Sequence, residues 1–329
     1  MFLRVHLLHP PDDDSLAILR QALSETVALS TGDDIPPEAQ VLVAGRPSAE
    51  QIAACPALQA VIIPFAGLPA ATRELLRQHP RISVHNLHHN AVPTAEMALA
   101  LLLAAAKRLV PADRALRSGD WTPRYRPIPA IHLNGKTALI LGYGAVGRHI
   151  ARLCKGIGMR AIAIRRTRPS ASAPTTEPAE AVYAISALHD LLPRADALLI
   201  ALPLTDVTRG LLGAQELGLL PPHAVLVNVG RAEIIEESAL FDALQSGRIH
   251  GAGLDVWYRY PSSPETRSAT APSNLPFHTL DNVVMSPHRA GGGGTPETER
   301  LRMLALADLL NQAANGKLLA NRVDLARGY

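Results

Sequence analysis

The segment LGYGAVGRHIARL, residues 141–153, decides the fold because it places the spacing GxGxxG between an apolar stretch and an amphipathic one. The preceding residues TALIL predict a β-strand, and the residues that follow predict a helix. In this setting Gly142 permits a tight turn, Gly144 lets the backbone approach a pyrophosphate, and Gly147 lets helix and strand pack closely. The segment therefore predicts a dinucleotide-binding unit.

The apolar stretches on both sides of this segment predict two parallel sheets. Five apolar stretches after the segment continue the sheet that TALIL begins, so this sheet has six predicted strands. The five stretches are AIAI, ALLIAL, AVLVNV, GAGLDV and NVVMSPH. In the first 90 residues, other short apolar stretches alternate with helical patterns, which is typical of a second parallel sheet covered by helices. A long helix is predicted from Thr94 to Ser118, and a last helix at about 296–315 should pack on the first sheet.

Composition limits the classes of function. At 329 residues the chain is long enough for two domains. Its 32 basic and 29 acidic residues give a net charge of only +3 without a basic run, so neither nucleic acid nor a membrane surface is expected as a partner. Cys55 and Cys154 form no CxxC pair, and the longest apolar run is too short for a membrane span. We expect a cytoplasmic protein without a metal site.

The end of the second strand of the dinucleotide unit reads IRRTRP, at a place where an acid usually binds the ribose 2′-hydroxyl of NAD. No Asp or Glu stands here, whereas Arg165, Arg166 and Arg168 do. Guanidinium groups suit a 2′-phosphate because they form charge-assisted, bidentate hydrogen bonds. The sequence therefore favours NADP(H), with NAD(H) still possible. An ordinary solvated basic loop is the alternative interpretation.

Three later stretches, NVGR, GLDVW and MSPH, each follow a strand of the same sheet and carry Arg231, Asp255 and His288. Ligands of such sheets bind at the carboxyl ends of the strands, so these side chains could reach one crevice. Taken singly, each could cap a helix or a turn, or hydrogen-bond within a linker. Beside a nicotinamide they would form an anion binder, an orienting group and an acid/base.

The ordered motifs GYGAVG, ALPLTDVTRGLLG, NVGR, GAGLDVW and SPH resemble those of the D-isomer-specific 2-hydroxyacid dehydrogenase family over nearly the whole chain. The resemblance implies an α/β fold with two doubly wound parallel-sheet domains. A flavodoxin-like substrate domain would comprise residues 1–103 and 290–329, and an inserted Rossmann cofactor domain would comprise residues 104–289. A cleft between the domains and a homodimer are also implied.

The resemblance also implies roles for individual residues. Arg231 would bind the substrate carboxylate and polarise its carbonyl, His288 would exchange a proton with the substrate oxygen, and Asp255 would hold the nicotinamide carboxamide. The other cofactor contacts implied by motif position are Gly142, Tyr143, Gly144, Ala145, Val146, Gly147, Pro203 and Val229. The implied substrate contacts are Gly67 and Leu68 through their backbone N–H groups, with Asn90. His88, where this chain departs from the family, is a further expected pocket residue.

Two places depart from the family's pattern. A Pro-Gly pair that the family carries before its first long helix is replaced by NLHHN, whose His88 and His89 either line the substrate pocket or are hydrogen-bonded loop residues. The Glu that hydrogen-bonds the catalytic His in the family is replaced by Tyr260. These two sites are therefore where this chain should differ from its relatives.

Tyr260 belongs to DVWYRYP, a cluster of three aromatic residues. We expect Trp257 and Tyr258 to pack and Tyr260 to face His288. A phenol can fix the imidazole by a hydrogen bond, but being neutral near pH 7 it cannot stabilise imidazolium as a carboxylate does. The pKa of His288 should therefore be lower than in relatives with the Glu. Alternatively, Glu265 supplies the missing carboxylate, or Tyr260 points away.

The sequence thus predicts an oxidoreductase that transfers a hydride between NADP(H) and a small 2-oxo or 2-hydroxy acid. Negative charge develops on the carbonyl oxygen during reduction, so a guanidinium and a proton donor beside it lower the barrier. One alternative is a formate-dehydrogenase-like hydride abstraction, and another is a non-enzymatic, cofactor-sensing corepressor. Tyr260, which is neither Glu nor Gln, and the arginines of the cofactor loop disfavour the formate enzyme. The presence of both Arg231 and His288 disfavours the corepressor.

Overall fold

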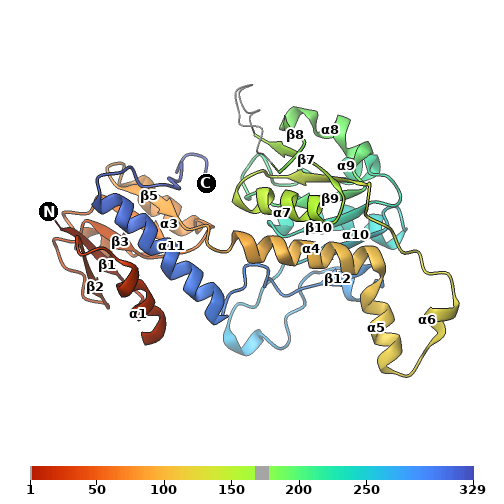
Figure 1. Ribbon diagram of the computed structural model, residues 1–329, viewed down its shortest axis with the longest axis horizontal. Helices are drawn as coiled ribbons and strands as arrows, with labels where there is room; N and C mark the ends of the chain where they lie inside the picture. The colour runs from red at the N-terminus through yellow and green to blue at the C-terminus, as the bar shows by residue number, and fades with distance from the viewer. Residues whose placement is uncertain (1, 167–177) are drawn as a thin grey trace. The chain divides into compact units, whose positions relative to one another are not determined.

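The computed structural model describes residues 2–166 and 178–329. The chain divides into two compact units (Figure 1): unit 1 is Met1–Asn90 with Gly292–Tyr329, and unit 2 is Ala91–Gly291. We had expected the boundaries near residues 103 and 290. The first division falls earlier because helix α4 (Ala91–Lys107) packs on elements of unit 2, among them α7 (Ala145–Gly156) and β11 (Gly251–Leu254).

Unit 1 contains a five-stranded parallel sheet in the order β2-β1-β3-β4-β5, which is the flavodoxin-like order. Its strands are β1 (Leu3–Leu7), β2 (Val27–Thr31), β3 (Val41–Val43), β4 (Ala60–Ile63) and β5 (Ser83–Asn86). The strands β3 and β4 are buried throughout, as expected for a sheet covered on both faces. The predicted fold class is confirmed for this unit.

Helices cover the two faces of the sheet of unit 1 (Figure 1). They are α1 (Asp13–Ala22), α2 (Ala49–Ala53), α3 (Ala70–Arg77) and α11 (Pro296–Ala314). The N-cap of α11 is Thr295, which accepts a hydrogen bond from the amide of Thr298. Leu306 and Leu310 of α11 share a core with Leu19 of α1, so the last helix packs on unit 1 as predicted.

Unit 2 contains a seven-stranded parallel sheet in the order β12-β11-β10-β9-β6-β7-β8. Its strands are β6 (Thr137–Leu141), β7 (Arg160–Arg165), β8 (Ala181–Ala184), β9 (Ala197–Ile200), β10 (Val225–Asn228), β11 (Gly251–Leu254) and β12 (Val283–Met285). Six of them were predicted. The seventh, the edge strand β8, has no fully buried residue and therefore lacks a continuous apolar signal.

Alternate side chains of the strands in unit 2 enter two cores. Leu139 and Leu226 lie in the core beneath α8–α10, whereas Ile140 and Val227 lie in the core beneath α4 and α7. The remaining helices of this unit are α5 (Leu109–Arg117), α6 (Thr122–Tyr125), α7 (Ala145–Gly156), α8 (Leu188–Leu191), α9 (Ala214–Leu219) and α10 (Glu237–Gln245). The sheet is therefore doubly wound, as predicted.

The single helix predicted from Thr94 to Ser118 is instead the two helices α4 and α5. The break lies at Arg108, whose φ of 53° is left-handed. Its guanidinium Nη2 donates to the carbonyl of His250, at 2.6 Å. A contact with a residue so distant in sequence gives no local signal, so the prediction of one continuous helix was wrong.

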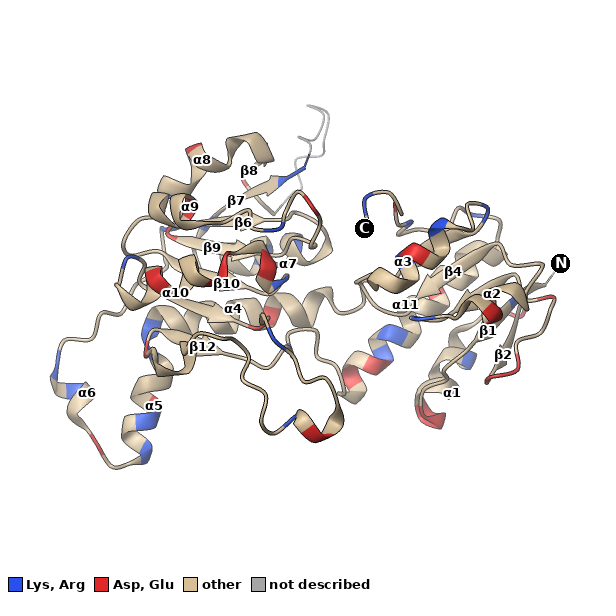
Figure 2. Cartoon of the chain, turned by 180° about the vertical axis from the view of Figure 1, so that it is seen from behind, with Lys and Arg blue, Asp and Glu red and all other residues tan. Residues whose placement is uncertain are grey.

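Charge is mixed on the helix surfaces. Acidic and basic residues are interspersed along α11 (Figure 2). In the described part of the chain, every helix is either too short or too polar to cross a lipid bilayer.

Candidate active site

The carboxyl ends of six strands in unit 2 lie along one edge of its sheet. Leu254 pairs with Asn228 and with Met285, and Asn228 pairs with Ile200. Leu141 pairs with Ile200 and with Ile164. Because these partners are in register, the loops that follow the strands begin at the same edge. That edge carries the glycine-rich turn, Arg231, Asp255 and His288.

The glycine-rich turn has the geometry that its sequence requires. Gly142 has a φ of 98°, and a Cβ there would lie 2.6 Å from the carbonyl oxygen of Ala201. A Cβ on Gly147 would lie 1.9 Å from the carbonyl oxygen of Gly142. Both positions therefore need glycine. A Cβ on Gly144, by contrast, would have no atom of the described residues within 4 Å beyond its chain neighbours.

Helix α7 begins at this turn and fits the pyrophosphate of a dinucleotide. Within the described residues, no side chain caps the helix at Gly144, and its first turn holds no acid. The amides of Ala145, Val146 and Gly147 thus form the positive end of a 12-residue helix. The open space beside Gly144 leaves room for an anion at these amides.

The other predicted cofactor residues lie in varied surroundings. Arg165 ends β7 and is half-buried, and Arg166 follows it on the surface. Arg168 lies outside the described residues. Pro203 is exposed and its carbonyl accepts from Oγ1 of Thr208, at 2.7 Å. Arg165 and Arg166 therefore lie at the end of β7, and Pro203 lies near the end of β9.

Tyr143 and Val229 contribute to the core. The ring of Tyr143 is buried, and its hydroxyl accepts from the amide of Ala179 at 3.0 Å. The amide of Val229 donates to the carbonyl of Ile200, at 3.1 Å, and its side chain packs against the core beneath α4 and α7. The side chain of Tyr143 therefore lies in the core, and only the backbone of this residue forms part of the glycine-rich turn.

Arg231 is held by a buried asparagine. Nδ2 of Asn228 donates to the carbonyl of Arg231 at 2.9 Å, and its Oδ1 accepts from the amide of Gly230 at 3.0 Å. The guanidinium of Arg231 donates to the carbonyl of Gly230, at 2.7 Å, and the residue is exposed. Sequence reasoning did not select Asn228, although a polar residue ending a buried apolar strand is a usable signal.

Asp255 fixes the loop that carries His288. It is fully buried. Its Oδ1 accepts from the hydroxyl of Ser286 and from the amide of Arg289, at 2.8 Å, and its Oδ2 accepts from the amide of Ala290, at 2.9 Å. These bonds use three of the roughly four acceptor positions of a carboxylate. Sequence reasoning had named the capping of a turn only as an alternative role for Asp255, and it missed Ser286.

His288 has a left-handed backbone, with a φ of 56° that is rare outside glycine. Its Nδ1 lies 2.9 Å from the hydroxyl of Tyr260, and that hydroxyl also accepts from the amide of Trp257 at 3.1 Å. The structure thus brings Tyr260 and His288 together. Glu265 is exposed and hydrogen-bonds Ser263 instead.

The other two rings of the cluster pack, as expected. Nε1 of Trp257 donates to the carbonyl of Ser286 at 2.8 Å, and its ring meets the edge of Phe277 with centroids 6.2 Å apart. The hydroxyl of Tyr258 donates to the carbonyl of Ile235, at 3.0 Å. Trp257 therefore supports the loop after β12 at a second point.

The surroundings of His288 favour its neutral form. Desolvation by the protein lowers the pKa of the imidazole, the Arg231 guanidinium lowers it further, and the Asp255 carboxylate opposes both. Desolvation raises the pKa of Tyr260, against the hydrogen bond from the amide of Trp257 and the charge of Arg231. Tyr260 therefore remains a neutral phenol near pH 7.

The predicted substrate contacts belong to unit 1. Gly67 and Leu68 lie in the loop between β4 and α3, which Nδ2 of Asn86 holds by donating to the carbonyl of Ala66, at 2.7 Å. His88 is exposed and Asn90 is half-buried. These residues follow the carboxyl ends of β4 and β5 of that sheet.

The pKa values of His88 and His89 are both lowered by their surroundings. Desolvation lowers the pKa of His88. Desolvation, with the charges of Arg302 and His88, lowers the pKa of His89 to about 4. Nδ1 of His89 is buried without a hydrogen-bond partner in the described structure.

Comparison with known proteins identifies the family. Residues 99–290 match the family model described as D-isomer specific 2-hydroxyacid dehydrogenase, NAD binding domain. This match covers more than half of the chain. The chain therefore belongs to the D-isomer specific 2-hydroxyacid dehydrogenase family, as its motifs predicted, and unit 2 contains the family's NAD-binding domain.

Two named relatives share part of their length with this chain. A glyoxylate reductase of Aeropyrum pernix is 40% identical over 237 residues, which cover 70% of this chain and 66% of that protein. A D-3-phosphoglycerate dehydrogenase of Methanocaldococcus jannaschii is 30% identical over 236 residues, which cover 72% and 42%. The chain thus spans less than two thirds of the length of each.

A solved structure shares the fold of the whole chain. It is a D-isomer specific 2-hydroxyacid dehydrogenase from Xanthobacter autotrophicus Py2, crystallised with NADPH and MES. The TM-score is 0.78 at 23% identity, and the match covers 100% of both chains. It confirms the predicted α/β architecture of two parallel sheets.

Proposed function

We propose that the protein is an NADP(H)-dependent oxidoreductase that interconverts a small 2-oxo acid and the matching 2-hydroxy acid. The observation that carries this proposal is the common sheet edge of unit 2, which holds an open helix N-terminus, an exposed guanidinium and a hydrogen-bonded imidazole. The relatives named glyoxylate reductase and D-3-phosphoglycerate dehydrogenase support it.

When bound, the nicotinamide supplies or accepts the hydride, and the residues of this chain handle charge and the proton. The Arg231 guanidinium binds the substrate carboxylate and polarises the adjacent carbonyl, because its planar fork matches those oxygens. His288 donates a proton from Nε2 to the oxygen on which negative charge develops. Gly67, Leu68, His88 and Asn90 are further substrate contacts in this proposal.

Tyr260 orients His288 in both protonation states. Its oxygen accepts from the amide of Trp257 and retains one O–H and one further acceptor position. Toward imidazolium the phenol oxygen accepts from the Nδ1 proton. After Nε2 has given its proton to the substrate, the neutral ring keeps the Nδ1 proton and the same hydrogen bond, so Nε2 is free to take a proton back in the reverse reaction. A neutral phenol adds no charge that stabilises imidazolium, which agrees with the lowered pKa of His288.

The preference for NADP(H) is supported by the residues at the end of β7. Arg165 and Arg166 stand where an acid would bind the ribose of NAD. The structural relative from Xanthobacter autotrophicus Py2 was crystallised with NADPH. Asp255, with one acceptor position left, receives the nicotinamide carboxamide in this proposal.

A homodimer is the proposed assembly. Helix α5 and the segment after it lie away from the sheet of unit 2 (Figure 1), and they carry exposed apolar side chains. These side chains are Leu109, Leu116, Trp121 and Tyr125. A second copy would bury such a surface. Trp121→Ser with Tyr125→Ser should yield a monomer in light scattering, and an unchanged dimer would contradict this surface.

Oxidation of NADPH with a panel of acids tests the proposed activity. The panel comprises glyoxylate, hydroxypyruvate, pyruvate and longer 2-oxo acids, with formate plus NADP⁺ as a separate reaction. At least one 2-oxo acid should be reduced, and His288→Ala should remove most of that turnover. Oxidation of formate alone would favour the formate-dehydrogenase-like alternative, and binding of NADPH without any turnover would favour a sensing role.

A further inference from the structure

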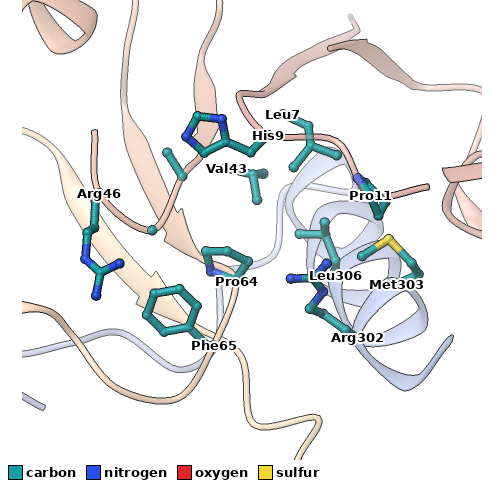
Figure 3. Close-up of a pocket in the computed structure, with 12 residues that line it drawn as sticks. Leu7, His9, Pro11, Val43, Arg46, Pro64, Phe65, Arg302, Met303 and Leu306 are labelled. Carbon is teal, nitrogen blue, oxygen red and sulfur yellow. The ribbon is translucent and has the colours of Figure 1, made fainter. Parts of the chain in front are cut away.

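A cavity of about 330 Å³ lies at the carboxyl edge of the sheet of unit 1 (Figure 3). It adjoins the ends of β1, β3 and β4, and β1 and β3 are the neighbours between which the strand order reverses. Such reversal points are where open α/β sheets bind ligands. The apolar residues lining it include Leu7, Val43, Pro64, Phe65, Met303 and Leu306.

Three basic side chains surround this apolar lining. His9 follows β1, Arg46 follows β3, and Arg302 comes from α11 (Figure 3). Arg302 forms an ion pair with Glu299 on its own helix. Arg46 and His9 are exposed, and neither has a hydrogen bond or an ion pair within the described residues. Arg46 is therefore the cation that this pocket can offer to a ligand.

The wall of the pocket continues into the segment proposed to bind the substrate carboxylate. Pro64 and Phe65 line the pocket and immediately precede Ala66, Gly67 and Leu68. The carbonyl of Ala66 is fixed by Asn86, as described above. The backbone donors of Gly67 and Leu68 thus lie on the same short loop as the pocket wall.

The loop that carries Arg46 is fixed as well. Oγ1 of Thr72, at the start of α3, donates to the carbonyl of Gly45 at 3.1 Å. The ring of Phe65 packs directly against Gly45. The guanidinium of Arg46 is thus attached to an anchored backbone next to an apolar cavity, which is the arrangement of a binding pocket with a polar group that fixes orientation.

We propose that this pocket binds the far end of the substrate, and that this end is a carbon chain terminating in an oxyanion. The apolar lining would contact the chain, and Arg46, assisted by His9, would bind a terminal carboxylate or phosphate ester. The inference rests on the proposed function and narrows it to 2-oxo acids with a second anionic group. A two-carbon acid such as glyoxylate would leave the cavity unfilled.

Pairs of substrates matched in chain length test this inference. The first pair is 2-oxoadipate with 2-oxohexanoate, and the second is 2-oxoglutarate with 2-oxopentanoate. A third comparison, of phosphohydroxypyruvate with hydroxypyruvate, tests a terminal phosphate. Its ratio, set beside those of the first two pairs, shows whether a phosphate or a carboxylate is preferred. Since a hydrogen bond to a charged group is strong, kcat/KM for the dianionic member of a pair should exceed that of the monoanionic member by about 10- to 100-fold.

The variant Arg46→Gln should reduce this ratio to about one, whereas the exposed control Arg20→Gln should retain it. A native ratio near one, or a ratio that survives in Arg46→Gln, would overturn the inference and leave the proposed function standing. If no 2-oxo acid is reduced, the proposed function fails. In that case calorimetry should measure the Kd of each member of the same pairs for the native protein and for Arg46→Gln. The ratio of the two Kd values within a pair then tests the pocket in the same way.

Discussion

The hydroxyl of Tyr260 lies 2.9 Å from Nδ1 of His288 and accepts, at 3.1 Å, the amide proton of Trp257. Two fixed points therefore hold the phenol: the backbone of the loop after β11 and the imidazole of the loop after β12. Asp255 and Trp257 hold the second loop through Ser286. The position of the imidazole is thus set by one hydrogen bond between its ring and the neutral phenol, and by the buried Asp255 carboxylate, which binds the backbone that follows His288.

His288→Ala should remove most reduction of any 2-oxo acid while NADPH still binds. Loss of a general acid lowers the rate by roughly 10² to 10⁴. Steady-state rates and a fluorescence titration with NADPH measure the two properties. The exposed His132, changed to Ala, is the control. Native turnover in His288→Ala would exclude this residue as the acid.

Arg231→Lys should be a poor replacement, even though it keeps the charge. A lysine cannot reproduce the planar, two-pronged contact with a carboxylate and its neighbouring carbonyl. We expect kcat/KM to fall by about 10- to 100-fold, on the scale of one or two hydrogen bonds to a charged group. The measurement is kcat/KM for the native protein, Arg231→Lys and the surface control Arg20→Lys. Equal values in all three proteins would contradict the assigned contact.

The variant Asn228→Ala should show whether Asn228 positions Arg231 or only stabilises the fold. The variant loses the bonds that hold Gly230 and the carbonyl of Arg231. Asn282→Ala is a matched control, since Asn282 also donates to a carbonyl of unit 2, that of Leu244, at 2.9 Å. Both variants should lower Tm, because each lost hydrogen bond costs about 0.5–1.5 kcal/mol.

Only Asn228→Ala should also raise the KM for the 2-oxo acid and lower kcat. The expected loss is up to about 100-fold, because small displacements of a binding group are costly. Equal kinetics in the two variants would show that Asn228 acts through stability alone.

The cofactor preference should reside in the arginines after β7. The native enzyme should prefer NADPH, and Arg165→Asp with Arg166→Ser should narrow or reverse the ratio of kcat/KM for the two cofactors. The introduced carboxylate would accept the ribose hydroxyls of NADH and repel a 2′-phosphate. Arg194→Asp, at an exposed site elsewhere in unit 2, is the control. A native preference for NADH of about tenfold or more would refute the role of these arginines.

Local patterns were sufficient to predict the sheets and the glycine-rich turn. Apolar stretches identify buried parallel strands, and the positions of Gly142 and Gly147 fit the observed close contacts, whereas Gly144 faces open space. Contacts between distant residues were not predictable. The left-handed Arg108 depends on the carbonyl of His250, and β8 pairs at a sheet edge with little burial.

The candidate site divides in the same way. Motif position brought Arg231, Asp255, Tyr260 and His288 to one sheet edge. Asn228 holds Gly230 and Arg231, which lie two and three residues further along the same turn, so its polar side chain at the end of an apolar strand was a local signal that sequence reasoning did not select. The pocket around Arg46 is formed by residues at the ends of β1, β3 and β4 and from α11, and no short motif encodes it. Sequence patterns therefore indicated the reacting groups better than the groups that position them.

The pH profile of reduction tests the account most directly, because it measures the state of His288 in the free enzyme. His288 must be protonated to donate, so kcat/KM falls as the pH rises through its pKa. Desolvation and Arg231 lower that pKa, and the phenol of Tyr260 does not offset them with a charge. A carboxylate at residue 260 would favour imidazolium, and a nearby opposite charge typically shifts a pKa by about 1 to 3 units.

The profiles of the native protein, Tyr260→Glu and Tyr260→Phe should therefore be compared on one substrate. The account predicts that the alkaline limb of Tyr260→Glu moves to higher pH. Tyr260→Phe, which loses the hydrogen bond without gaining a charge, should lose rate and keep its limb near the native one. A limb that stays at the native pH in Tyr260→Glu, with full activity in both variants, would contradict any role of Tyr260 in orienting His288.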